Sequence, residues 1–198
     1  DVTAIVVSAY DNATAVNGGD VYAYSMTGTN YDVTGIGAYA GGTASVTNTA
    51  DGSVVANAYS GYAYGIHARG YDYALAYNDG YVHASSFTGD ATGILAESFQ
   101  YGSSVTNTGT VEAYSLIGQG YGIVATSILG YSSIDNSGGV YASGSVSVGA
   151  LASSTIGAST VYNSGTIVST GAYAGIGAAA VSIIGDVIPP RERGRYQG

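Results

Sequence analysis

The clearest copy of a recurring stretch reads Val105-Thr106-Asn107-Thr108-Gly109-Thr110-Val111-Glu112-Ala113. Its asparagine returns at intervals of 31, 30, 29, 29 and 27 residues, at Asn17, Asn48, Asn78, Asn107, Asn136 and Asn163. A period near 30 residues is typical of proteins that stack one structural unit upon the next. The repeat therefore determines the fold, and most of the sequence is used to build a scaffold.

Each repeat contains three short segments in which apolar and polar residues alternate. The first ends at the asparagine, the second begins at a valine such as Val111, and the third reads Gly-Ile-x-Ala, as at 122–125. Alternation with a period of two, bounded by Gly, Asn, Ser and Thr, indicates β-strands. Three strands in each turn predict an all-β parallel β-helix, a β-solenoid of about six turns of roughly 30 residues, on the order of 30 Å long. We expect this domain to span residues 1–188, followed by a basic tail or linker at 189–198.

Composition narrows the functional classes. The 198 residues include 32 Gly and 20 Tyr, lack Cys and Trp, and carry a net charge of −9. Without cysteine there is no disulfide and no thiolate metal site. An acidic chain is a poor partner for nucleic acid or an anionic membrane, and no apolar run is long enough to span a bilayer. Because the chain begins with Asp1, we expect that a leader has been removed; a fragment of a longer protein is the alternative.

The recurring asparagines have a structural interpretation. Each precedes a turn sequence such as Thr-Gly, Ser-Gly or Gly-Gly, where an asparagine side chain bonds to local backbone groups. Identical side chains stacked from turn to turn also bond to one another, as amide ladders do in cross-β stacks. We therefore predict a structural ladder of asparagines rather than a functional site.

Alignment on the asparagine places charged residues next to one another in neighbouring turns. Arg69 and Glu97 each lie three residues after the Ile of their repeat, and Tyr39 has the same position one turn earlier, facing the guanidinium. His83 and Glu112 share another position, one residue after the Val. We interpret both as cross-rung pairs that fix the register, worth about 0.2–1 kcal/mol each. A metal or acid–base site is the alternative, although zinc needs three or four convergent ligands.

One edge of the predicted solenoid is rich in tyrosine. The loop between the second and third strands shortens towards the C-terminus, and such an edge is where a solenoid usually carries its specific surface. Exposed aromatic rings with a polar group favour interfaces, so we predict a binding surface for glycans or proteins there. Its members are Tyr24, Tyr31, Tyr59, Tyr62, Tyr64, Tyr114 and Tyr121. The alternative is that the tyrosines pack across turns and cover a sheet of alanines.

The sequence does not favour an enzyme. Its Asp residues are scattered through turns and loops, where they usually bond to local backbone. The glycine-rich segment 118–122 looks like a nucleotide-binding loop, but no helix follows it and it falls inside the repeat. We expect no catalytic residues, no cofactor and no metal.

Both ends of the repeat array fall within a turn. Residues 4–7 fit the third strand of an earlier turn, and residues 186–188 fit the first strand of a seventh. Exposed strand edges pair readily, and a head-to-tail contact that does not close builds a filament. The candidate assembly contact with the acidic body of a neighbouring copy consists of Arg191, Arg193, Arg195 and Tyr196. An ordinary linker within a longer protein is the alternative.

Residues 105–113, with Gly-Tyr-Gly-Ile-Val-Ala at 120–125 and Asn-Ser-Gly-Thr-Ile at 163–167, resemble the passenger repeats of bacterial autotransporter and filamentous-haemagglutinin-like surface proteins. The resemblance covers nearly all of residues 1–188. It implies a secreted or cell-surface bacterial protein, a right-handed β-helix and a role in adhesion or surface structure, and no catalytic residue carries over. We therefore expect an extracellular structural solenoid that stacks with copies of itself into a fibre. The alternative is an adhesin segment that binds glycan or host protein through the tyrosine-rich edge.

Overall fold

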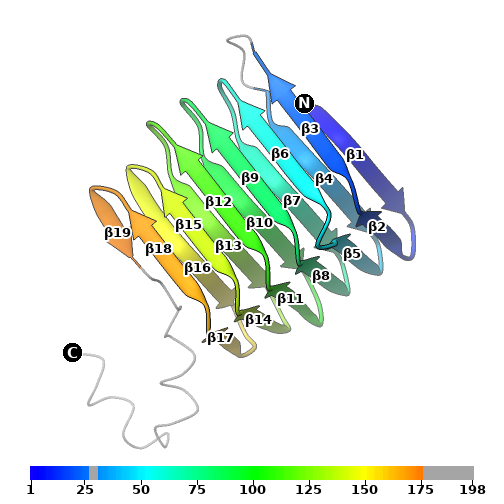
Figure 1. The fold of residues 1–198 in the computed structure, drawn as a ribbon. Coiled ribbons are helices and arrows are strands. Elements are labelled where there is room, and N and C mark those ends of the chain that lie inside the picture. Colours follow the sequence, from blue (N-terminus) through cyan, green and yellow to red (C-terminus); the bar gives the residue numbers. More distant parts are fainter. Residues whose placement is uncertain (27–30, 176–198) are drawn as a thin grey trace, which may run out of the picture.

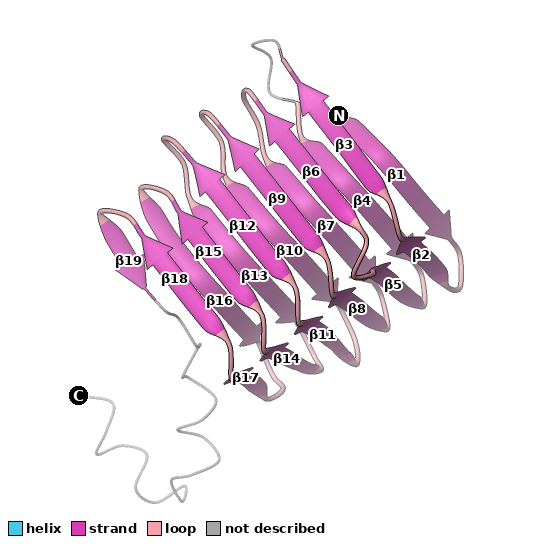
Figure 2. Cartoon of the chain, in the orientation of Figure 1, coloured by secondary structure: helices cyan, strands magenta, loops and turns pink. Residues whose placement is uncertain are grey.

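The computed structural model describes residues 1–26 and 31–175, and within those ranges the secondary structure consists of strands without helices. The strands form three parallel sheets, and successive turns of the chain add one strand to each sheet (Figures 1 and 2). The protein is an all-β solenoid of about six turns with about 29 residues in each, as the repeat predicts. None of the described residues belongs to a helix long and apolar enough to cross a membrane.

The three sheets follow one another around each turn. Sheet A contains β1 (Val2–Ala9), β4 (Val33–Ala40), β7 (Ala63–Gly70), β10 (Ala91–Ser98), β13 (Gly120–Ser127), β16 (Val146–Ser154) and β19 (Tyr173–Gly175). Sheet B contains β2 (Ala13–Asn17), β5 (Thr43–Asn48), β8 (Tyr73–Asn78), β11 (Gly102–Asn107), β14 (Tyr131–Asn136) and β17 (Ser159–Asn163). Sheet C contains β3 (Asp20–Ser25), β6 (Ser53–Ala58), β9 (Tyr81–Ser86), β12 (Thr110–Ser115), β15 (Gly139–Ser143) and β18 (Thr166–Thr170).

Equivalent residues of the repeat lie directly beside one another in neighbouring turns. In sheet A the isoleucine of the Gly-Ile motif pairs with the same isoleucine of the next turn, from Ile36 through Ile66 and Ile94 to Ile123. Ile5 of β1 pairs with Ile36, which confirms that the first strand has the third-strand position of its turn. Register in this solenoid therefore follows the repeat, so that each position of the repeat forms a column parallel to the long axis.

The core is made of small side chains. Ile and Ala from sheet A, Val from sheet C, and Ala, Val or Ile from sheet B point inward and form one hydrophobic cluster. Alanines of sheet C such as Ala56 and Ala84 form a second cluster with Ala63 and Ala91 at the start of the sheet A strands. Ile66, Val82 and Val105 are among the residues with no exposed surface. Removal of this apolar surface from water is the main contribution to stability, because about 25 cal/mol is gained for each Å² buried.

The predicted asparagine ladder is present, and it lies inside the solenoid. Asn48, Asn78, Asn107 and Asn136 are fully buried. Each Nδ2 donates to the Oδ1 of the next asparagine, at 2.7–2.8 Å along the whole series from Asn17 to Asn163. The same amide nitrogens also donate to a glycine carbonyl of the following turn segment, as Asn107 does to Gly109 at 3.2 Å. Because these buried amides bond to one another and to the backbone, they need no buried water as a hydrogen-bond partner.

The glycine of the Gly-Ile motif is required by space. A Cβ atom added to Gly93 would lie 2.3 Å from Val111 Cγ1 and 2.6 Å from the carbonyl oxygen of Gly122. Gly35, Gly65 and Gly122 have the same surroundings in their own turns. Among the described glycines only Gly61 has a positive φ, so close packing between sheets A and C, and not backbone conformation, explains why glycine recurs in this column.

The loops between sheets C and A differ in length, as predicted. In the middle turns these loops are residues 59–62, 87–90 and 116–119, and near the C-terminal end the loop shortens to residues 144–145. Residues 176–198 lie outside the described part of the chain. The predicted domain boundary at 188 and the predicted assembly contact at Arg191, Arg193, Arg195 and Tyr196 therefore lie outside it too.

Candidate functional site

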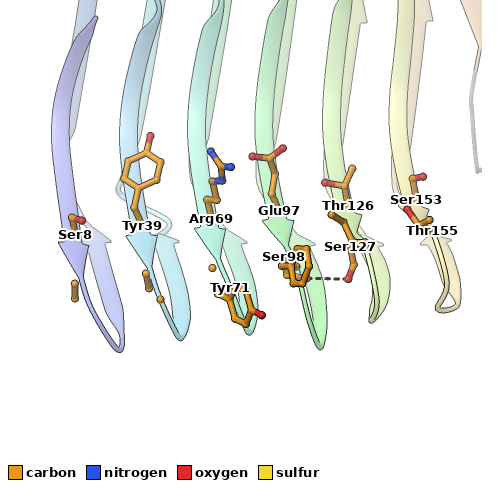
Figure 3. Close-up of a pocket in the computed structure, with 16 residues that line it drawn as sticks. Ser8, Tyr39, Arg69, Tyr71, Glu97, Ser98, Thr126, Ser127, Ser153 and Thr155 are labelled. Carbon is orange, nitrogen blue, oxygen red and sulfur yellow. Dashed lines mark hydrogen bonds between the residues drawn. The ribbon is translucent and has the colours of Figure 1, made fainter.

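A groove of about 710 Å³ runs along the solenoid where sheet A turns into sheet B, and we call it the polar groove (Figure 3). One side is an outward column of sheet A that pairs residue by residue across six strands. This polar row consists of Ser8, Tyr39, Arg69, Glu97, Thr126 and Ser153. At about 4.8 Å per turn, the row spans roughly 24 Å.

The opposite side of the polar groove is aromatic and aliphatic. Tyr71 and Phe99, at the corner after β7 and β10, stack with ring centroids 5.0 Å apart and planes 18° apart, and both rings are about half exposed. Ile128 continues this wall in the next turn. Between wall and row the residues are small, and the Ser98 hydroxyl donates to that of Ser127 at 3.1 Å. The groove therefore combines a polar side, an apolar side and a shallow floor.

The middle of the polar row is held by a histidine. His67 Nε2 lies 3.0 Å from Glu97 Oε2, and the Tyr39 hydroxyl lies 3.4 Å from His67 Nδ1. The ring of Tyr64 stacks on the imidazole at 5.1 Å. The hydrogen bond from His67 is the largest influence on Glu97 and holds the pKa of its carboxyl below the usual value, against the opposing effect of burial. Glu97 is therefore a fixed carboxylate in the groove.

The predicted pair of Arg69 with Glu97 needs correction. The two residues are register partners, as is Tyr39 with Arg69. The carboxylate, however, pairs with His67, and the Tyr39 ring meets the imidazole edge-on rather than the guanidinium. Within residues 1–26 and 31–175, Arg69 makes neither a hydrogen bond nor an ion pair. Strand alternation places His67 on the same outward face as Arg69, and that signal could have identified it from the sequence.

The second predicted pair is present on sheet C. His83 Nδ1 lies 3.2 Å from Glu112 Oε2, and the two residues are register partners. The Tyr81 hydroxyl donates to the same oxygen at 2.7 Å. Burial, followed by this hydrogen bond and the charge of Glu112, raises the pKa of Tyr81. Tyr81 is a partner that the sequence reasoning did not include.

The predicted tyrosine surface divides into two groups. Tyr24, Tyr59 and Tyr114 line a second groove of about 620 Å³ where sheet C turns into sheet A, which we call the aromatic groove. It also contains Met26, Phe87 and Leu116, which the tyrosine pattern of the sequence does not indicate. Tyr59 and Phe87 stack at 5.3 Å with planes 10° apart.

The remaining predicted tyrosines lie at the ends of these loops or at the beginning of the sheet A strands. Tyr62 stacks on Tyr64 at 6.2 Å, and the Tyr121 hydroxyl donates to Gln119. Burial, with smaller contributions from Asp32 and Glu97, raises the pKa of Tyr64 to about 12. Tyr31 precedes β4 on the same edge. Among the described residues, no ring contact joins this group to Tyr24, Tyr59 and Tyr114.

Comparison with known proteins adds no family to this description. A scan against protein-family models and searches of curated proteins and of solved structures found no match. In the described part of the chain, no group of three or more His, Cys, Asp or Glu side chains is placed to hold a metal ion. The resemblance to surface-protein passenger repeats therefore stays a prediction.

Proposed function

We propose that this protein is an extracellular structural solenoid, without enzymatic activity, that stacks head to tail with copies of itself into a surface fibre. The observation that carries the proposal is the edge of β1. Among the described strands β1 pairs only with β4, and its register is that of every later turn. Its inward residues Ile5 and Val7 are only partly buried against the core. A further turn stacked on β1, which we propose that another copy supplies, would bury them and pair this edge.

Two other features support the proposal. The columns of Ile, Val, Ala and Asn continue through the described turns with little change. Successive turns therefore have similar cross-sections, and a turn of one copy can stack on a turn of another. The contact would be heterologous and would not close, which is the geometry of a filament rather than a ring. An acidic, cysteine-free chain with passenger-like repeats fits an extracellular location.

The test is electron microscopy and light scattering of the purified full-length chain, with matched variants of β1. We expect rods much longer than the roughly 30 Å of one copy. Ile5→Lys places a charge at the inward junction and should abolish the rods, whereas Val6→Lys, on the outward face where Val6 is 59% exposed, should not. Circular dichroism verifies that both variants stay β-rich. Deletion of residues 189–198 tests the predicted tail contact, and monomers at every concentration of the unaltered protein would overturn the proposal.

A second candidate, an adhesin segment, is favoured by the aromatic groove. Its lining contains no charged side chain, and Tyr59, Phe87 and Leu116 present exposed apolar surface across three turns. Such a surface suits an apolar patch on a partner protein, because buried aromatic residues provide most of the binding energy at interfaces. Binding of the labelled chain to host cells should fall at least tenfold for Tyr59→Ser. Tyr77→Ser, which removes an equally exposed ring from sheet B, is the control and should bind normally; equal binding by both variants rejects this candidate.

A further inference from the structure

We propose that the polar groove binds an uncharged, linear polysaccharide that lies parallel to the long axis of the solenoid. The proposal is independent of end-to-end assembly and of the aromatic groove. It rests on the juxtaposition of the polar row with Tyr71 (Figure 3) and with Phe99, which stacks on Tyr71. The ligand class follows from three properties of the groove: its shape, the polar atoms that it offers, and its charge.

The shape of the groove fits an extended chain. The polar row follows strand pairing across six turns, so its side chains lie in a straight line at about 4.8 Å intervals. The wall runs along the same line, because Tyr71, Phe99 and Ile128 belong to successive turns. A linear polymer meets the same pair of surfaces at each step, whereas a compact small molecule would use only one part of them.

The available polar atoms suit hydroxyl groups. Arg69 is exposed, and a guanidinium offers five donors in a planar fork. Glu97 uses Oε2 to accept from His67 and makes no described bond through Oε1, so that oxygen can accept from a ligand hydroxyl. The hydroxyls of Tyr39 and Thr126 lie on either side of this pair in the same row. Sugar hydroxyls both donate and accept, and the apolar face of a sugar ring packs on aromatic rings such as Phe99.

The same geometry disfavours a peptide strand. Backbone groups of sheet A bond to the strands above and below, along the axis, so the groove presents no open strand edge. A peptide that binds by strand addition needs such an edge. Recognition in the groove must therefore use side chains. A peptide bound there would leave its own backbone amides without partners, whereas a polyhydroxylated ligand has no amides to satisfy.

Charge decides between neutral and acidic polysaccharides. The groove lining contains one cation, Arg69, and one anion, Glu97, so that its formal charge is balanced. The protein around it carries a net charge of −9. A polymer with a carboxylate on every sugar would meet a single guanidinium and a repulsive body. An uncharged polymer meets no such penalty.

The test is calorimetric titration of the full-length chain with defined oligosaccharides. The probes are the hexasaccharides of cellulose, laminarin, mannan and xylan, the matching disaccharides, and an alginate hexasaccharide as the acidic comparison. We expect at least one neutral hexasaccharide to bind ten times more tightly than its disaccharide, because the row spans several turns. Affinity should fall at least tenfold for Phe99→Ser and about fivefold for Arg69→Gln.

The chain offers a matched control for the wall. Phe87 stacks on Tyr59 in the aromatic groove much as Phe99 stacks on Tyr71 in the polar groove. Phe87→Ser loses a comparable half-exposed ring and should bind the oligosaccharide within twofold of the unaltered protein, with a similar melting temperature to Phe99→Ser. The proposal is overturned if no neutral hexasaccharide binds, if Phe87→Ser weakens binding as much as Phe99→Ser, or if alginate is the preferred ligand.

Discussion

The inward and outward faces of the same strands follow different rules. In sheet A the inward column contains Ile at five successive turns, from Ile5 to Ile123. The outward row three residues later changes from Ser8 through Tyr39, Arg69 and Glu97. An inward side chain is confined by the turns above and below it as well as by the facing sheets, whereas an outward one meets solvent. Positions that repeat from turn to turn therefore identify the core of the solenoid. Positions that vary within an outward column identify the surface that is specific to this protein.

The largest expected effect comes from the inward glycine column. In Gly93→Val the new side chain would overlap Val111 and the backbone oxygen of Gly122, and backbone cannot move aside without disturbing the next turn. We expect a loss of about 3 kcal/mol or more in the free energy of unfolding, since overpacking of a filled core costs about 1–3 kcal/mol and a backbone clash lies at the upper end. Urea denaturation followed by circular dichroism measures it.

Gly19 is the control for that substitution. A Cβ added there meets nothing within 4 Å, so Gly19→Val should change stability by less than about 0.5 kcal/mol, as for surface positions in general. If both variants unfold at the same urea concentration, steric exclusion is not the reason for the glycine column.

The next largest effect is expected in the asparagine ladder. Asn107→Ala removes the acceptor of Asn78 Nδ2 and the donor to Asn136 Oδ1, both at 2.7 Å in the buried interior. A buried polar group left without its partner costs about 1–3 kcal/mol, so we expect about 2 kcal/mol from the same denaturation experiment. Asn163 lies at the last described step of the ladder and is exposed, so Asn163→Ala should cost less than about 1 kcal/mol. Equal losses at the two positions would argue against a cooperative interior ladder.

The interior could be predicted from the sequence because equivalent residues of neighbouring turns are often identical and stack on one another. Once Asn107 is aligned with Asn78, every inward column follows, and so does the place of β1 in its turn. Two physical facts were still missing. The sequence does not show that the amides point inward, because Asn is as common in exposed turns as in ladders. Nor does it show that Gly93 is needed for space, since nothing in the repeat reveals which atoms approach it.

The outer surface was less predictable. Register placed Glu97 beside Arg69, but side-chain length and direction decided that the carboxylate reaches His67 in the adjacent column. The same applies to Tyr81, which bonds to Glu112 from a neighbouring position on its strand pair. The polar groove was not foreseen at all, because it joins a strand row to corner residues such as Phe99 that vary in every turn.

The smallest expected effect is a pH dependence at the outer row. Glu97 has a lowered pKa in the folded protein, with His67 as the first cause. A carboxyl whose folded pKa lies below its unfolded value contributes stability above the unfolded value, near 4.5, and loses it as the pH falls through the folded value. Melting temperature should therefore decline below pH 4.5 more steeply in the unaltered protein than in Glu97→Gln.

The size of this decline in melting temperature distinguishes the outward row from the inward columns. The Glu97 side chain is 38% exposed, so solvent screens the pair and its contribution should stay below about 1 kcal/mol. Asn107→Ala, an inward change without a titrating group, should lower the melting temperature at pH 7 and leave its slope below pH 4.5 unchanged. If Glu97→Gln retains the full acid dependence of the unaltered protein, the His67 contact does not hold the carboxylate. The outer row would then be linked to the scaffold by strand register alone.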